Sequence, residues 1–302
     1  MAFNLYFAGQ QAKEVDEYLQ QKGALRLFSQ ANEKKGIQEW QTDGYAKKLF
    51  VDSGAFSVAH AGKKVDIDEY ITYINSNPEI PIFVELDVIP YPVLNTRTAK
   101  ECCEATWQNY LYMKERVTSP CQLLPLYHFG EPKDALRRIL NTEVNGKLPE
   151  YIGIGGRHGV ATELQEKYFN EIFAIVQRSD NPKVKIHAFG MTILRVLEQY
   201  PFYSADSTTW LQLGINGNIL TKSYGIITVS ERSQFNKDNA NAFPAKAKQK
   251  IIDEVESMGY TLEEVSTNYK KRLMYNIDVL LEWAHNYQYK GPKEFKLATK
   301  LF

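Results

Sequence analysis

The chain of 302 residues is 44% hydrophobic and carries 36 basic and 36 acidic side chains, so its formal net charge is zero. This balance leaves no global field that would draw the protein onto nucleic acid or an anionic membrane. A nucleic-acid contact would therefore need a local basic surface, for which residues 237–250 and 290–300 are the candidates. No run of about 20 apolar residues occurs, so no membrane contact is predicted.

The three cysteines are an odd number and include an adjacent pair, Cys102 and Cys103, which is a poor basis for disulfides. We therefore expect a reducing, cytoplasmic location. No secretory signal is expected at the N-terminus. No spacing of Cys and His residues typical of zinc occurs, so no metal site is predicted.

Eight short apolar runs that end in polar residues or Gly predict strands at 4–9, 24–29, 48–54, 81–87, 122–130, 151–156, 185–190 and 202–206. Helical patterns lie between most of them, at 11–23, 97–117, 132–140, 162–178 and 192–200. This alternation favours an α/β fold, a parallel (β/α)8 barrel of the TIM type over residues 1–230. An open, doubly wound sheet is the alternative.

The pattern changes after Asp206. Residues 213–225 read as a loop or hairpin, 226–230 as an added strand, and 244–259 and 262–288 as helices. We therefore expect residues 231–302 to form a C-terminal helical extension packed on the barrel.

Polar residues and glycines follow the predicted strands. In a barrel the carboxyl ends of all strands face one opening, so these residues are expected to converge there. They are Asp52, Ser53, Gly54, Asp87, His128, Gly155, Gly156, His187, Gly190 and Asp206. Each has a structural alternative, such as a helix cap for an acid, a core position for a histidine or a tight turn for a glycine.

Three converging carboxylates suit glycosidic chemistry. One acid can act as a nucleophile, a second can transfer protons with a pKa raised by burial, and a third can accept hydrogen bonds from the substrate. Carboxylates also stabilise the oxocarbenium-like transition state of such reactions. Phe56 and Tyr127 offer faces on which a flat base could stack, although both also fit a core.

These residues resemble the motifs of the tRNA-guanine transglycosylase superfamily, whose DNA-modifying relatives occur in phages and bacterial islands. The similar segments are DSGAFS at 52–57, VELDVIP at 84–90, LYHFGE at 126–131, IGIGG at 152–156, HAFG at 187–190 and YSADSTTW at 203–210. Their order along the chain matches the family. Ala55 and Ser57 depart from the family's DSGGFQ pattern, and His128 stands near its Gln position.

The resemblance implies a role for each site residue. Asp206 would attack C1′ of a guanosine nucleotide and hold it covalently, and Asp52 would be the general acid and base. Asp87 would accept hydrogen bonds from the guanine edge. Gly155 and Gly156 would offer backbone groups to the base. The remaining proposed substrate-binding residues are Ser53, Gly54, Phe56, His128, His187 and Gly190.

The resemblance also bears on the substrate. The tRNA enzymes carry a cysteine-rich zinc site after the catalytic strand, whereas residues 207–302 contain no cysteine here. The resemblance therefore favours DNA as the partner, with guanine exchanged for a free 7-deazaguanine base. It implies that no cofactor is needed, since one glycosidic bond replaces another, and that a target inside a duplex would first be flipped out. It also implies the host cytoplasm as the location if the chain is phage-encoded. The alternatives are the same exchange on tRNA, a retaining nucleoside or glycoside hydrolase, and a barrel that only binds a nucleobase or a protein.

Overall fold

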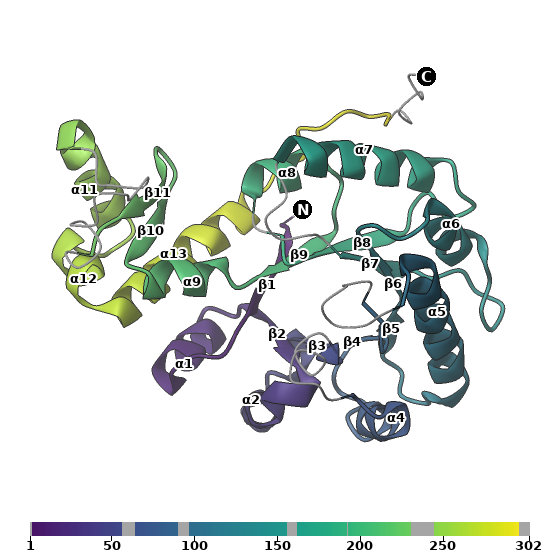
Figure 1. Cartoon of the computed structure of the whole chain (residues 1–302). Helices are drawn as coiled ribbons and strands as arrows, with labels where there is room; N and C mark the ends of the chain where they lie inside the picture. Colours follow the sequence, from purple (N-terminus) through teal and green to yellow (C-terminus); the bar gives the residue numbers. More distant parts are fainter. Residues whose placement is uncertain are drawn as a thin grey trace. The chain divides into compact units, whose positions relative to one another are not determined.

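The structure is a computed structural model that describes residues 2–55, 64–89, 97–155, 162–191, 193–230 and 245–295. Strands and helices alternate through most of the chain (Figure 1). The first nine strands are β1 (Asn4–Ala8), β2 (Leu25–Ser29), β3 (Leu49–Asp52), β4 (Ile82–Val84), β5 (Gln122–Leu124), β6 (Leu126–His128), β7 (Tyr151–Gly155), β8 (Lys185–Phe189) and β9 (Ser204–Ser207).

The helices between these strands are α1 (Lys13–Gln21), α2 (Gln30–Thr42), α4 (Ile67–Asn75), α5 (Ala99–Arg116), α6 (Lys133–Asn141), α7 (Thr162–Gln177) and α8 (Leu194–Gln199). The later elements are α9 (Thr209–Ile215), the hairpin β10 (Asn218–Thr221) and β11 (Gly225–Thr228), α11 (Lys248–Ser257), α12 (Leu262–Thr267) and α13 (Tyr269–His285). Short 3-10 turns occupy Ala46–Lys48 and Ala245–Ala247.

The first nine strands form one sheet in the order β5-β4-β3-β2-β1-β9-β8-β7-β6. The pairs from β2 to β5 and from β6 to β9 are parallel and in sequence order, as expected for strands joined by helical crossovers. The sheet is nearly closed, which confirms the predicted α/β barrel of the TIM type with a helical C-terminal extension.

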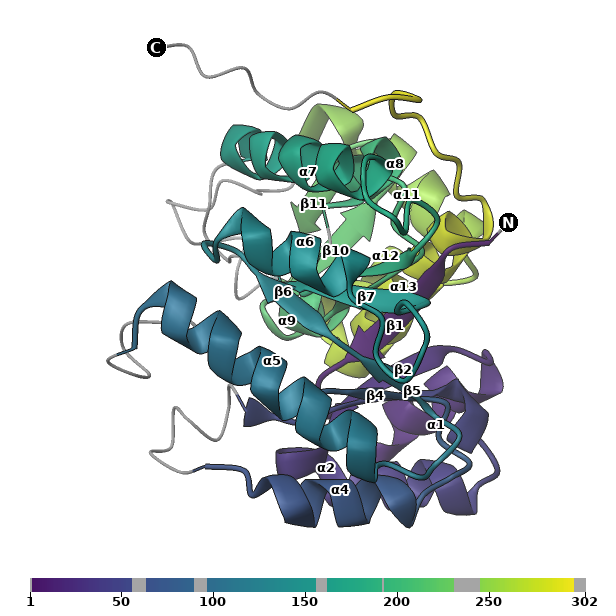
Figure 2. The same ribbon diagram turned by 90° about the vertical axis from the view of Figure 1, so that its right-hand side faces the viewer.

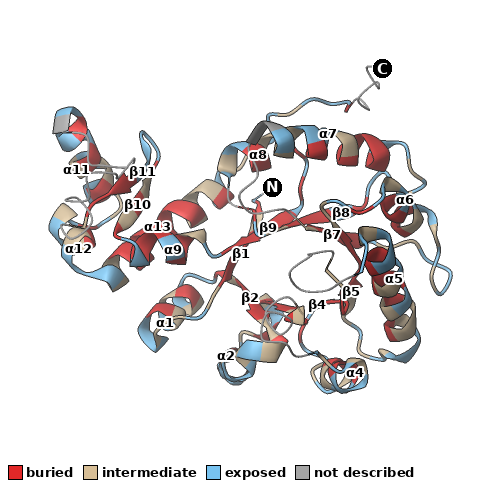
Figure 3. Ribbon diagram, viewed as in Figure 1, coloured by how far each residue is buried: buried red, intermediate tan, exposed pale blue. Residues whose placement is uncertain are grey.

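The chain divides into two compact units. One comprises Met1–Ala24 and Ser207–Tyr287, and the other, which we call the barrel unit, comprises Leu25–Asp206 and Gln288–Phe302. In the barrel unit, α2, α4, α5, α6 and α7 lie outside the strands in two perpendicular views (Figure 2). Their apolar faces are buried against the strands and their outer faces are exposed (Figure 3).

Two local differences from the sequence-based expectations have a physical cause. The predicted strand 122–130 is two strands, β5 and β6, separated by Pro125, which has no N–H to continue a ladder. The predicted helix 262–288 is two helices, because the Asn268 side chain accepts hydrogen bonds from the backbone N–H groups of Lys270 and Lys271 and so caps a new helix. Helices α2, α4 and α9 were not predicted.

The unit that contains α13 has its own core. Asn276 of α13 is fully buried and joins α13 to β10, since its Oδ1 accepts the N–H of Leu220 at 2.9 Å. Asp278 accepts hydrogen bonds from Tyr18 at 2.6 Å and Tyr260 at 2.8 Å, and Lys22 pairs with its other oxygen at 2.9 Å. These contacts fix α1 and α13 to each other through one carboxylate.

Within the described ranges no helix has the length and apolar character needed to cross a membrane. Cys102, Cys103 and Cys121 are free thiols, and the first two are buried in α5.

Candidate active site at the carboxyl ends of the barrel strands

The segment after β3 places Asp52 and folds sharply behind it. Gly54 has a φ of +80°, and a Cβ at this position would collide with Ser29 Oγ, so the turn requires glycine. Ser53 is fully buried, and its Oγ accepts the N–H of Ala55 at 3.2 Å. The turn directs the N–H groups of Ser53 and Gly54 at the Asp52 carboxylate.

The environment of Asp52 brings the three predicted acids together. Burial raises its pKa from 3.8 to about 7, the negative charges of Asp87 and Asp206 add to this rise, and the N–H groups of Ser53 and Gly54 oppose it. Charges act on one another this strongly only at short range. Acids from three separate strand ends, in both halves of the barrel unit, therefore share one region.

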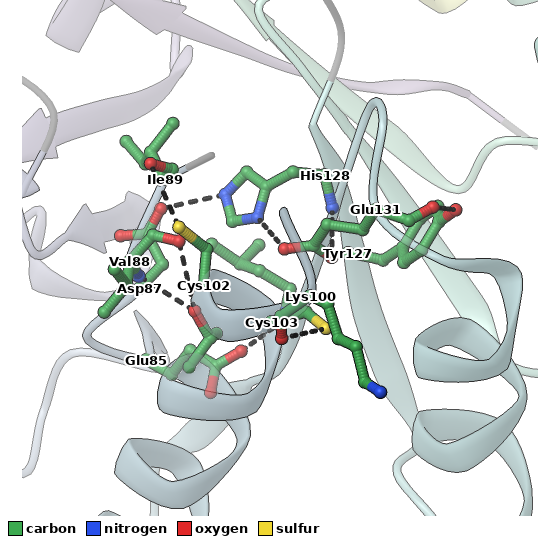
Figure 4. Close-up of polar contacts among 12 residues, drawn as sticks. Glu85, Asp87, Val88, Ile89, Lys100, Cys102, Cys103, Tyr127, His128 and Glu131 are labelled. Atoms are coloured by element: carbon green, nitrogen blue, oxygen red, sulfur yellow. Dashed lines mark hydrogen bonds and ion pairs between the residues drawn. The ribbon is translucent and has the colours of Figure 1, made fainter. Parts of the chain in front are cut away.

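Asp87 follows β4 and is held by His128, the last residue of β6. His128 Nε2 lies 2.9 Å from Asp87 Oδ2, and His128 Nδ1 lies 3.2 Å from Glu131 Oε1. Figure 4 shows the imidazole ring between the two carboxylates. Burial alone would lower the pKa of His128, but the hydrogen bonds and charges of Asp87 and Glu131 outweigh it and raise the pKa to about 10.

A tight turn returns Glu131 to His128. The N–H of Glu131 donates to the carbonyl of His128 at 3.2 Å, and Gly130 has a φ of +94° at the third position of the turn, as a type II turn requires. Glu131 Oε2 then accepts the backbone N–H of His128 at 3.0 Å, and the Tyr127 hydroxyl donates to the Glu131 carbonyl at 2.8 Å. In the segment HFGE, His128 and Glu131 are therefore joined by hydrogen bonds in both directions.

Asp206 in β9 is fixed through one oxygen. Its Oδ1 accepts the N–H of Gly190 at 2.9 Å and lies 3.2 Å from Nε2 of the fully buried His187. His187 Nδ1 lies 2.5 Å from Ser204 Oγ, which also contacts the Tyr151 hydroxyl. Burial lowers the pKa of His187 despite the Asp206 charge, so a neutral ring donates to Asp206 from Nε2 and accepts from Ser204 at Nδ1.

The glycines at the strand ends lie against these side chains. Gly155 pairs with His128 across β6 and β7, and a Cβ on it would come within 3.0 Å of His128 Cδ2. Gly190, with a φ of +62°, follows β8 and donates to Asp206. Phe56 and Gly156, both predicted to bind substrate, lie outside the described residues.

Two buried acids of this region were not predicted. Glu131 is 5% exposed and Glu85 is 1% exposed. Glu85 Oε1 accepts the N–H of Leu126 at 2.5 Å, and burial raises its pKa well above the ordinary value. The only sequence signals were a carboxylate three residues after His128, across a Gly turn, and one two residues before Asp87.

Tyr127, proposed above as a stacking face, is fully buried and packs on Tyr168 with a ring separation of 6.4 Å, so it belongs to the core. Across the described part of the chain, no group of three or more His, Cys, Asp or Glu side chains is arranged to hold a metal ion. The arrangement offers one carboxyl group that titrates near neutrality and two carboxylates held by neighbouring residues, Asp87 by His128 at Oδ2 and Asp206 by Gly190 at Oδ1.

Comparison with known proteins does not assign this site. A scan against protein-family models finds no match to the chain, and a search of curated proteins finds none either.

Proposed function

We propose that this protein is a transglycosylase that exchanges guanine in DNA for a 7-deazaguanine base through a covalent Asp206–nucleotide intermediate. The observation that carries the proposal is the shared environment of Asp52, Asp87 and Asp206, in which both other acids raise the pKa of Asp52. The type of reaction is inferred from the order of the motifs around these residues, which resembles that of the transglycosylase superfamily.

The proposed reaction has two half-reactions. In the first, an oxygen of Asp206 forms a bond to C1′ while the bond from C1′ to the guanine nitrogen breaks, and the protonated Asp52 gives its proton to the departing base. In the second, Asp52 takes a proton from the incoming base, whose nitrogen displaces Asp206 from C1′. The sum exchanges one glycosidic bond for another and leaves both acids as they began.

The geometry supports these roles. Asp206 has Oδ1 fixed by Gly190 and His187, which aligns the carboxylate for attack by its other oxygen. Asp52 has a pKa of about 7, so at neutral pH it is populated both as an acid and as a base, which a group that protonates one base and deprotonates another requires.

The experiment combines a labelled base with a trapped adduct. Purified protein is incubated with single-stranded DNA, duplex DNA or tRNA and a radiolabelled 7-deazaguanine, and covalent complexes are separated on a denaturing gel. We expect label in DNA and an adduct that Asp206→Asn abolishes, whereas Asp180→Asn, which makes the same change on an exposed residue of the barrel unit, keeps both.

Each alternative predicts a different result. An undiminished adduct in Asp206→Asn would refute the covalent role of this residue. Label that enters only tRNA would change the substrate and keep the chemistry. Release of free guanine without any incoming base would identify a hydrolase.

A further inference from the structure

The His128 ring is held by carboxylates at both nitrogens. Nε2 lies 2.9 Å from Asp87 Oδ2 and Nδ1 lies 3.2 Å from Glu131 Oε1, and the side chains of Asp87 and Glu131 are only 7% and 1% exposed. Glu131 Oε2 is occupied by the backbone N–H of His128. Both edges of the ring are therefore committed within the protein (Figure 4).

This geometry determines the protonation state of the ring. A neutral imidazole has one donor and one acceptor, so it would direct a lone pair at one of the two carboxylates. Only the imidazolium donates from both nitrogens, and each bond is then charge-assisted. The rise in the pKa of His128 to about 10 agrees with this reading.

Other titratable groups lie close to these three residues. Burial raises the pKa of Glu85 well above its ordinary value, which favours its neutral form. Burial also raises the pKa values of Cys103 on α5, Tyr127 on β6 and Tyr168 on α7, which face Glu131 and remain neutral at pH 7. The partners that the ring contacts are therefore the carboxyl groups of Asp87 and Glu131.

From this arrangement we infer that His128 and Glu131 are positioning residues for Asp87, so that Asp87 presents one fixed oxygen to hydrogen-bond donors of the base. Within the described ranges His128 contacts the Asp87 carboxylate at Oδ2. The inference assigns Oδ1 to the ligand. Glu131 orients the ring and His128 holds the acid, and neither needs to touch the base.

The identity of the ligand in this inference rests on the proposed function. The protonation state of the His128 ring does not. His187 provides an internal comparison, because its Nε2 lies against Asp206 and its Nδ1 lies against Ser204. The two rings of the site therefore differ in their partners, and we expect the His128 ring to be a cation and the His187 ring to be neutral.

The first test is independent of activity. Long-range ¹H–¹⁵N NMR spectra of the ¹⁵N-labelled protein at pH 7.5 report the protonation of each imidazole nitrogen, and a His128→Gln variant assigns its signals. We expect two protonated nitrogens for His128 and one for His187. A neutral His128 ring would overturn the inference even if the enzyme exchanges bases as proposed.

The second test measures base recognition. We expect His128→Gln and Glu131→Ala to raise the KM for the incoming base by about tenfold or more with kcat changed far less, since Asp87 is no longer held in position to accept its hydrogen bond from the base. Glu131→Gln should restore KM only in part, because its amide oxygen can accept from the ring but its NH2 group cannot accept from the backbone N–H of His128. Glu104→Gln on the exposed surface of α5 is the matched control.

The split between KM and kcat separates positioning from a general loss of structure, and thermal unfolding confirms that each variant is folded. An unchanged KM in folded His128→Gln and Glu131→Ala would refute the inference. Failure of the wild type to bind any base would refute the proposed function instead, while the NMR result would still decide the state of the ring.

Discussion

Replacing Asp52 with Asn should make the protein more stable at alkaline pH, although it removes a residue assigned to catalysis. The carboxyl of Asp52 has its pKa raised from 3.8 to about 7 by burial and by the charges of Asp87 and Asp206. A raised pKa means that the folded state binds the proton more tightly than the unfolded state. The stability contributed by this proton is fully present below pH 3.8 and is lost as the pH rises through 7.

The magnitude follows from the shift. A difference between 3.8 and about 7 corresponds to about 4 kcal/mol, because one pKa unit is worth about 1.4 kcal/mol. Roughly 2.5 kcal/mol of this falls between pH 5 and pH 8. Asp52 keeps part of its surface exposed, so solvent screening makes these values upper bounds.

The assay is chemical denaturation of the wild type and Asp52→Asn between pH 5 and pH 8.5 at constant ionic strength, followed by tryptophan fluorescence and far-UV circular dichroism. We expect the variant to gain stability relative to the wild type as the pH rises, while Asp180→Asn shows no such trend. A difference that is independent of pH, or that favours the wild type at high pH, would refute the shared buried site of the three acids.

Three further predictions test particular positions. Gly54→Ala should destabilise the protein by more than the roughly 1 kcal/mol expected for Gly44→Ala. Both glycines have a positive φ, but of the two only Gly54 lacks room for a Cβ. Urea denaturation measures both losses, and equal losses would contradict this reasoning. Gly155→Ala should reduce base exchange and shift the NMR signals of His128, because the new methyl group meets its ring at 3.0 Å, and unchanged signals would exclude the contact. Asp278→Asn should lower the free energy of unfolding by roughly 2–4 kcal/mol, since the hydroxyls of Tyr18 and Tyr260 and the ammonium of Lys22 lose a charged partner. A loss below about 0.5 kcal/mol would show that this network is dispensable.

The sequence by itself determined the barrel and the strand ends. Short apolar runs separated by helical patterns predicted eight strands, because a parallel sheet buries both faces of each strand and joins them by helices. The acids Asp52, Asp87 and Asp206 were singled out because each follows a predicted strand and the carboxyl ends of barrel strands face one opening. Local periodicity carries this information, so no tertiary contact was needed.

Only the tertiary structure decided which partners surround the acids and histidines of the site. Glu131 and His128 are three residues apart, but their partner Asp87 is 41 residues before His128, and no local pattern reports a bond over that distance. The protonation states of His128 and His187 likewise depend on which side chains surround each ring, since burial and neighbouring charges set a pKa. The sequence shows which titratable groups the chain contains, but the pKa of each depends on the burial and the neighbouring charges that folding produces.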